Sequence, residues 1–303
     1  MIDDREVTMT AITPSRGVSA RIASLQLRRR PQRRRPGGLT TSYIFLAVLM
    51  MIYLVPLFYL LNTALKTEGS FNRDPLGLTS AFAFSNFAEA WVAGNFSAYI
   101  LNSVGYTAIA ATAGTLISLV LAFPVSRGYV KYPRLWYGIF VVSLFLPNIL
   151  ITQFQLVLRL GLYDTQLGYI LVMATSVGIG PLLIAGYLKS VPKELDEAAA
   201  LDGAGYWRYL FTFVPRLTMP ALVTVLILQA IGVWNDIILA TILMPNRANS
   251  PISLGLFAFQ GQYSNQWPLL AAATLIVAAP LLMAYVFLQR FLIGGVLGGT
   301  LKG

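Results

Sequence analysis

The stretch that decides the fold is a polar interruption in an apolar chain, PKELDEAAALDGAGYWRYLFTFVPRLTMP, residues Pro192–Pro220. Four of the chain's twelve acidic residues lie within its first eleven positions. Long apolar segments precede and follow it, so we expect it to project from one face of a membrane. A polar projection between two apolar segments is suited to contact with a soluble partner.

The composition is typical of a membrane protein and excludes several kinds of chemistry. Of the 303 residues, 56% are hydrophobic and 11% are charged, with a mean hydropathy of +0.68, whereas soluble domains carry about 25% charged residues. The chain has no cysteine and no histidine, which excludes disulfides, thiolate nucleophiles and histidine-based triads. It also lacks a GxxxxGK(S/T) phosphate-binding loop. Zinc hydrolases and enzymes that use a Ser-His-Asp or Cys-His arrangement are thereby excluded, and we expect no metal site.

Six apolar segments are long enough to cross the ~30 Å hydrocarbon core, which takes a helix of ~20 residues. We expect an all-α integral membrane domain over residues 41–303, with a helix–turn–helix loop over 190–220 between spans four and five. In the longest outer loop, residues 85–91 predict a short helix capped by Ser85 or Asn86. The predicted spans are Tyr43–Ala64, Ala98–Val125, Trp136–Leu158, Gly168–Leu188, Met219–Ile238 and Pro268–Leu288.

The positions of Lys and Arg predict the orientation of the chain. Six spans place both termini on one side of the membrane. If that side is the cytoplasm, the inner segments hold 18 basic residues and the outer loops hold 4. Without the N-terminal tail the ratio is still 9 to 4. The positive-inside rule then predicts cytoplasmic termini and a cytoplasmic 190–220 loop.

Residues 1–40 form a basic tail that includes the run RRRPQRRRPGG at 28–38. This composition cannot build an apolar core, so we expect the tail to be disordered. Nucleic-acid binding is not favoured, because no aromatic residues interleave with the arginines. Contact with anionic lipid on the cytoplasmic side is the favoured interpretation.

The spans carry almost no ionisable side chain, which argues against an ion-coupled transporter. Asp236, near the outer end of span five, is the exception. Uncharged polar residues, Asn62 and Asn102 among them, suit a neutral hydroxylated solute, although interhelical hydrogen bonds worth about 0.6 kcal/mol each are their commoner role. Asp236 either lines an outer gate or meets an extracytoplasmic partner; alternatively, Trp234 belongs to the interfacial aromatic belt and Asp236 merely ends the helix. The candidates for the translocation path or outer gate are Asn148, Gln153, Gln229, Trp234, Asn235 and Asp236.

The polar stretch reads as two short helices joined by a turn. Pro192 suits the first turn of a helix, and the acids that follow it favour a helix N-terminus. Gly203 is expected to end this helix in the left-handed conformation. A second helix is expected over Tyr206–Phe213, after which Pro215 and Pro220 return the chain to the bilayer. A helix lying on lipid is disfavoured, because the acidic face would oppose the negative inner leaflet.

The segment EAAALDGA at 197–204, with the aromatic residues and two prolines that follow, resembles the EAA motif of ABC importer permeases. In that family the loop docks on a cytoplasmic ATPase. The resemblance covers roughly residues 42–303 and is specific to the carbohydrate-uptake branch, in particular the maltose-type G subunit. Its other matches are LNTALK at 61–66, NFAEAW at 86–91, LGLYDTQLGYI at 160–170, WND at 234–236 and the terminal QRFLIGGVLGGTLKG. It implies coupling roles for Glu197, Ala198, Ala199, Asp202, Gly203 and Ala204.

The resemblance implies a permease subunit that moves a mono- or oligosaccharide across the cytoplasmic membrane by alternating access. The implied partners are a second permease subunit, two ATP-binding subunits and an extracytoplasmic solute-binding protein. ATP and Mg would bind to the ATPase, so no cofactor is expected in this chain. An ABC permease for a polyol or another small solute is the alternative, and an ion-coupled secondary transporter is less favoured. The family usually has Leu-Pro where this chain has Pro215-Arg216, which leaves open how the second coupling helix ends.

Overall fold

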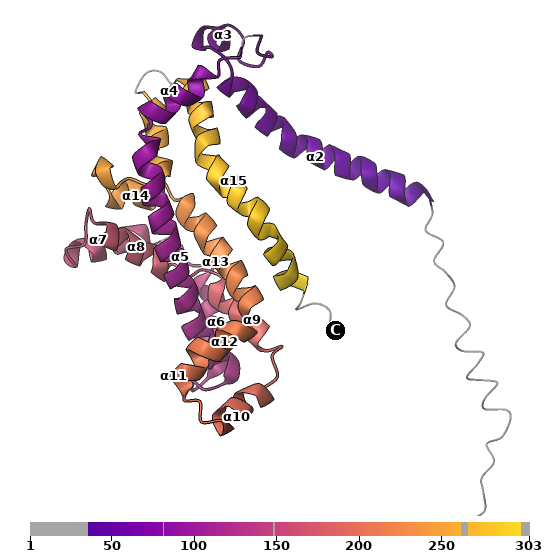
Figure 1. Ribbon diagram of the computed structural model, residues 1–303, viewed down its shortest axis with the longest axis vertical. Helices are drawn as coiled ribbons and strands as arrows, with labels where there is room; N and C mark the ends of the chain where they lie inside the picture. The colour runs from indigo at the N-terminus through magenta and orange to yellow at the C-terminus, as the bar shows by residue number, and fades with distance from the viewer. Residues whose placement is uncertain (1–35, 81, 148, 262–265, 298–303) are drawn as a thin grey trace, which may run out of the picture. The chain divides into compact units, whose positions relative to one another are not determined.

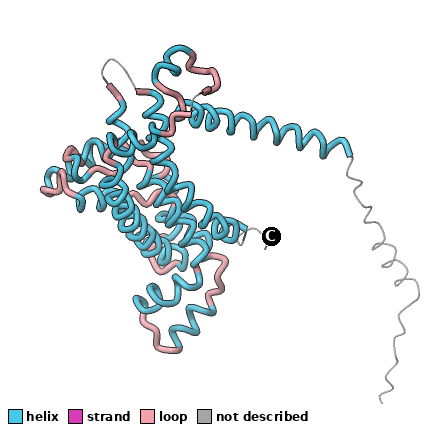
Figure 2. Tube along the Cα trace, turned by 45° about the horizontal axis from the view of Figure 1, so that its top comes forward, coloured by secondary structure: helices cyan, strands magenta, loops and turns pink. Residues whose placement is uncertain are grey.

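The computed structural model describes residues 36–80, 82–147, 149–261 and 266–297 (Figure 1). Helices and loops account for all of these residues, and none of them forms a β-strand (Figure 2). By its packing the chain divides into residues 1–56 and residues 57–303. The described part of the first unit belongs to helix α2 (Pro36–Ala64), whose large apolar side chains from residue 43 to residue 56 are exposed. This helix starts inside the predicted tail, because proline is favoured in a first helical turn.

The remaining helices belong to the second unit and pack around one long helix, α5. This helix contacts α8, α9 and α13 along its length, so it forms the centre of the unit. The elements are α3 (Glu68–Arg73), α4 (Ser85–Ala93), α5 (Phe96–Arg127), α6 (Pro133–Ser143), α7 (Leu150–Arg159), α8 (Gln166–Thr175), α9 (Gly180–Leu188), α10 (Glu194–Leu201), α11 (Tyr206–Arg208), a π-helix (Tyr209–Phe213), α12 (Val214–Leu217), α13 (Met219–Trp234), α14 (Ile238–Leu243), two 3-10 helices (Arg247–Asn249, Ile252–Phe259) and α15 (Trp267–Leu297).

Three buried clusters follow one another along α5. Phe96 belongs to the first cluster, with residues of α13 and α15. Tyr106 belongs to the second, with residues of α8 and α14. Phe123 belongs to the third, with residues of α9, α10 and the π-helix. The segment around α10 is thus joined to the membrane helices by an apolar core of its own.

Three described helices are long and apolar enough to span a membrane, Ser42–Ala64, Phe96–Arg127 and Trp267–Phe287. Two bent pairs raise the number to as many as five: α8 with α9, which meet at 44°, and Tyr206–Leu217 with α13, which meet at 87°. The apolar character of spans one, two and six is therefore confirmed. Span four is a broken helix, in which Pro181 starts the second half.

The prediction of one helix over Trp136–Leu158 is wrong, because residues 144–149 separate α6 from α7. Pro147 lies in this break. A proline lacks the N–H of a helical bond, clashes with the carbonyl four residues earlier, and disfavours a helical residue before it. The eleven residues of α6 rise only ~16 Å, which is about half of the hydrocarbon core.

The predicted outer-loop helix is present as α4, but its cap differs from the prediction. Its N-cap is Phe84, and no side chain caps it. Asn86 is buried instead, and its Nδ2 donates to the carbonyl oxygens of Ala64 and Lys66, each at 2.8 Å. Helix ends leave carbonyls without partners. The Asn86 amide therefore hydrogen-bonds carbonyls at and just after the end of α2 and does not cap the start of α4.

Candidate coupling and translocation sites

The first helix of the polar stretch, α10, ends as the sequence predicts. Gly203 has a φ of +76°. Its N–H donates to the Ala200 carbonyl at 3.0 Å, and the N–H of Ala204 donates to the Ala199 carbonyl at 2.9 Å. This pair of bonds is the Schellman motif, which requires a left-handed residue at the position of Gly203. The chain therefore turns sharply after α10 and starts a second helix at Tyr206.

The second helix runs past its predicted end at Phe213 and finishes at Leu217. Pro215 lies inside it, just after a π-helical turn in which the Val214 N–H bonds to the Tyr209 carbonyl five residues back. This wider turn accommodates a proline that has no N–H to donate. The change of direction comes at Thr218, whose hydroxyl donates to the Val214 carbonyl at 2.7 Å. We call residues 194–217 the knob.

One buried arginine connects the knob to two membrane helices. Arg127 ends α5, and its Nη1 donates to the carbonyls of Leu188 at 3.1 Å and Val191 at 2.9 Å, at the end of α9. Its Nη2 donates to Asp196 Oδ1 at 3.1 Å, and its Nε lies 2.7 Å from Asp196 Oδ2. The two side chains are only 3% and 8% exposed. The Nη2 hydrogen bond and the charged contact at Nε together hold the Asp196 carboxylate against the guanidinium.

Tyr209 completes this connection from the second helix of the knob. Its hydroxyl donates to Asp196 Oδ1, and its ring lies 5.9 Å from the Phe123 ring of α5. Burial and the bond to Asp196 raise the pKa of Tyr209, so the hydroxyl stays protonated and acts as a donor. Both helices of the knob are therefore tied to α5 through one carboxylate.

The six predicted coupling residues occupy two sides of the knob. Ala199 is buried in the core shared with α5 and α9, and Ala204 is half-buried. The other four, Glu197, Ala198, Asp202 and Gly203, are exposed. Leu201 is 89% exposed beside them. The exposed side thus combines carboxylates, small residues and one large apolar side chain.

Arg127, Asp196 and Tyr209 are not among the site residues predicted from the sequence. Arg127 counted only as one of the inner basic residues, and 69 positions separate it from Asp196. The sequence held no signal that pairs Arg127 with Asp196, because an arginine at the end of an apolar span can also reach the membrane interface without a buried partner.

Three predicted path residues from separate elements line one hollow of about 310 Å³. They are Gln153 of α7, Gln229 of α13 and Asp236, which follows α13. No Lys or Arg is among the residues that line it. Gln229 Nε2 lies 3.4 Å from the Ser176 carbonyl, in the break between α8 and α9. The hollow therefore offers amide donors and acceptors with a single carboxylate.

The other predicted path residues lie elsewhere. Trp234 is 6% exposed, and its Nε1 donates to the Val277 carbonyl of α15 at 3.0 Å, so it belongs to the core and not to an exposed aromatic belt. Asn235 is exposed at the end of α13. Asn148 lies outside the described residues.

Asp236 has a structural role in addition to lining the hollow. Its Oδ2 accepts from the Ala240 N–H at 2.9 Å and from the Tyr169 hydroxyl at 3.1 Å. Its own carbonyl accepts from the Ser253 hydroxyl at 2.6 Å. The carboxylate thus starts helix α14 and holds it against α8. These contacts give Asp236 a role at a helix end, while its place at a path or outer gate stays a prediction.

Two asparagines of the polar set make interhelical or loop bonds. Asn62 Nδ2 donates to the Gly77 carbonyl at 2.9 Å. Asn102 Nδ2 donates to the carbonyls of Ala248 at 3.0 Å and Ser250 at 3.1 Å. For these two residues the structural role explains the side chain without a ligand.

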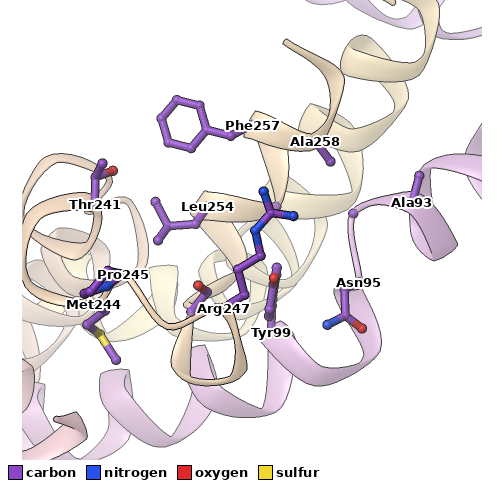
Figure 3. Close-up of a pocket in the computed structure, with 13 residues that line it drawn as sticks. Ala93, Asn95, Tyr99, Thr241, Met244, Pro245, Arg247, Leu254, Phe257 and Ala258 are labelled. Atoms are coloured by element: carbon purple, nitrogen blue, oxygen red, sulfur yellow. The ribbon is translucent and has the colours of Figure 1, made fainter. Parts of the chain in front are cut away.

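A second hollow, of about 380 Å³, lies at the opposite end of α5 from Arg127. The start of α5, the end of α14 and the two 3-10 helices line it. Figure 3 shows Arg247 within this lining, between Leu254 on one side and Asn95 on the other. Arg247 has no ion-pair partner within the described part of the chain.

Comparison with known proteins points to one family. Residues 114–296 match the family described as "Binding-protein-dependent transport system inner membrane component". The melibiose/raffinose/stachyose import permease protein MelC of Bacillus subtilis (strain 168) is 26% identical over 85% of this chain and 94% of its own length. The diacetylchitobiose uptake system permease protein NgcG of Streptomyces coelicolor is 28% identical over 86% and 88%.

The fold is similar to a solved structure as well. A crystal structure of a bacterial ABC transporter involved in the import of the acidic polysaccharide alginate matches with a TM-score of 0.69. The match covers 92% of this chain and 99% of that chain, at 19% identity. At that identity the likeness establishes the shared fold.

Proposed function

The chain belongs to the family of binding-protein-dependent transport system inner membrane components, and on this premise we propose that it carries a neutral mono- or oligosaccharide into the cell. It is the permease subunit of an ABC importer, a transport component and not an enzyme. Its family and its apolar helices place it in the cell membrane as a multi-pass protein. An importer of this kind also includes an ATPase and a solute-binding protein.

We assign it six spans, with α6 and α7 together forming an interrupted third span. Both termini and the knob then lie in the cytoplasm, as the excess of inner Lys and Arg predicts. In the complete transporter a second permease subunit pairs with this one, and two ATPase subunits bind below. ATP and Mg bind to the ATPases.

The observation that carries this proposal is the connection of the knob to α5 and α9 through Arg127. A surface that receives movement from an ATPase must pass it to the membrane helices. The exposed residues Glu197, Ala198, Asp202 and Gly203 supply the surface in this proposal, and the Arg127–Asp196 pair supplies the link. Ala199 and Ala204 act from the inner side, where they pack the knob on the permease.

The 310 Å³ hollow lined by Gln153, Gln229 and Asp236, which we call the central hollow, supports a neutral sugar as the solute. Sugar hydroxyls need donors and acceptors, and the amides of Gln153 and Gln229 offer both. A phosphorylated or strongly acidic solute favours Arg or Lys, and neither lines this hollow. The relatives named above also act on sugars. A polyol shares the same hydroxyl chemistry and is the alternative solute.

Uptake into proteoliposomes that hold the full transporter, with ATP inside and labelled solutes outside, tests the proposal. We expect ATP-dependent accumulation of a neutral saccharide, and competition among radiolabelled sugars and polyols then identifies the class. Accumulation driven by a proton or sodium gradient without ATP would reject the proposal. Uptake of a polyol alone would leave the importer mechanism standing and replace the solute.

A further inference from the structure

A third hollow, of about 580 Å³, lies beside the knob and has a basic lining. It is formed by the end of α5, the start of α6, the end of α9 and the residue before α10. Four of the nine residues that line it are cations: Arg127, Arg134, Lys189 and Lys193. No acidic side chain is among them.

Only one of these four cations is neutralised. Arg127 is paired with Asp196. Arg134, Lys189 and Lys193 form no ion pair with any residue that the structure describes. The Lys189 ammonium lies over an aromatic ring, with its Nζ 4.4 Å from the centre of Tyr137. Three unpaired positive charges around one concave surface form a site for an anion.

The surroundings of the hollow are those of a membrane interface. Tyr129, Tyr132, Leu135 and Trp136 lie next to it in the chain and are between 46% and 65% exposed. Exposed Tyr and Trp are enriched where the hydrocarbon core meets the headgroups. Basic pockets between membrane helices on the cytoplasmic side bind anionic headgroups. An anion bound in this hollow therefore lies next to an apolar surface that could contact the acyl chains of a lipid.

We infer that this hollow binds the phosphate headgroup of an anionic phospholipid from the inner leaflet, next to the knob. The inference rests on the proposed function, since it takes its orientation from the cytoplasmic placement of the knob. Arg134, Lys189 and Lys193 contact the headgroup, and the exposed aromatic residues before and within α6 lie against the acyl chains. The bound lipid occupies the angle between α5, α6 and α9, where Arg127 anchors the knob.

The test uses the assembled transporter in nanodiscs of phosphatidylcholine with a graded fraction of phosphatidylglycerol. Native mass spectrometry counts the phosphatidylglycerol that each complex retains. Arg134→Gln combined with Lys189→Gln removes two charges from the hollow, at about 1 kcal/mol each near a charged membrane. We expect roughly 30-fold weaker retention. The control combines Arg208→Gln with Arg216→Gln, which removes the same charge from exposed positions of the knob.

Equal retention by the two double variants overturns the inference. If the hollow variant fails to assemble, Lys189→Gln alone replaces it, with Arg216→Gln as its control. Binding of inorganic phosphate to the lipid-free complex, at concentrations that displace phosphatidylglycerol, makes the ligand a free anion and rejects a lipid. A second measurement crosslinks position 193, which lines the hollow, to the ATPase. A crosslink that forms only in the absence of anionic lipid supports the site, and a crosslink that forms with or without anionic lipid rejects it. Retention is measured without sugar, so failed uptake with normal retention counts only against the proposed function.

Discussion

The knob and the central hollow both contain polar side chains, but these side chains are held in opposite ways. At the knob, one carboxylate is paired with an arginine and accepts from a tyrosine hydroxyl, and both side chains of the ion pair are almost fully buried. At the hollow, Gln229 makes a single 3.4 Å contact, from its Nε2 to the Ser176 carbonyl. The first arrangement suits a part that transmits movement without deforming, and the second suits a part that must open and accept different partners.

Replacing Arg127 with alanine tests the rigid side of this comparison and has the largest expected effect. The change leaves Asp196 buried without its counter-charge, and breaking a buried pair from one side costs about 3–5 kcal/mol. We expect a large fall in the thermal stability of the complex and loss of uptake. Asp196→Asn, which keeps the shape and the bond from Tyr209, should cost less. Equal stability of the wild type and Arg127→Ala would show that the knob is held mainly by its apolar core.

Replacing Gly203 with valine tests the turn that shapes the knob. A left-handed backbone costs about 1–2 kcal/mol for an ordinary residue, and more for a β-branched one. We expect uptake to be lost while the chain still inserts and ATP hydrolysis no longer responds to the loaded binding protein. Gly205→Val is the matched control, since Gly205 has a φ of −64° and no atom lies within 4 Å of an added Cβ at either position. Normal uptake by Gly203→Val would reject the role of the turn.

Replacing Gln229 with leucine tests the open side. Loss of one neutral hydrogen bond is worth about 0.5–1.5 kcal/mol, so we expect KM for sugar uptake to rise up to about tenfold. Thermal stability should change little. Gln155→Leu is the control, because Gln155 is an exposed amide on α7 outside the lining of the hollow. The same KM for both variants would mean that sugar does not pass Gln229.

Removing residues 1–35 should have the smallest effect. The inner loops still carry more Lys and Arg than the outer loops, so orientation and uptake should stay unchanged.

The chain contains no cysteine, so a single Arg208→Cys or Arg247→Cys reports the side of the membrane through labelling with an impermeant reagent. Labelling of position 208 from outside would reverse the proposed orientation.

The sequence predicted the fold well where local chemistry decides it. Gly203 ends α10 because no other residue enters the left-handed region as readily, and apolar runs without charges formed α2, α5 and α15. The sequence predicted the fold poorly where a residue's role depends on contacts with other elements. Asn86 looked like a helix cap, and instead it satisfies the carbonyls that end α2. Pro215 looked like a stop, and a π-helical turn carries the helix past it.

The residues of the candidate sites were likewise predicted in part, and their grouping in space was not. The sequence named Gln153, Gln229 and Asp236 as separate polar residues, and the structure brings them to one hollow. It also named Trp234, which is a core residue against α15. The ion pair that anchors the knob joins positions 127 and 196. No local pattern relates residues so far apart, because their proximity depends on how α5 and α9 pack.

The length of α5 turns this anchorage into a lever. At 32 residues the helix is ~48 Å long. Arg127 holds its near end to the knob. At its far end, Asn102, Ser103 and Tyr106 hydrogen-bond the backbone of residues 248–252 beside the 380 Å³ hollow. If the helix moves as a stiff rod, a rotation of roughly 10° about Arg127 carries the far end sideways by about 8 Å. A small movement of α5 close to Arg127 therefore produces a larger movement at the other end of the helix.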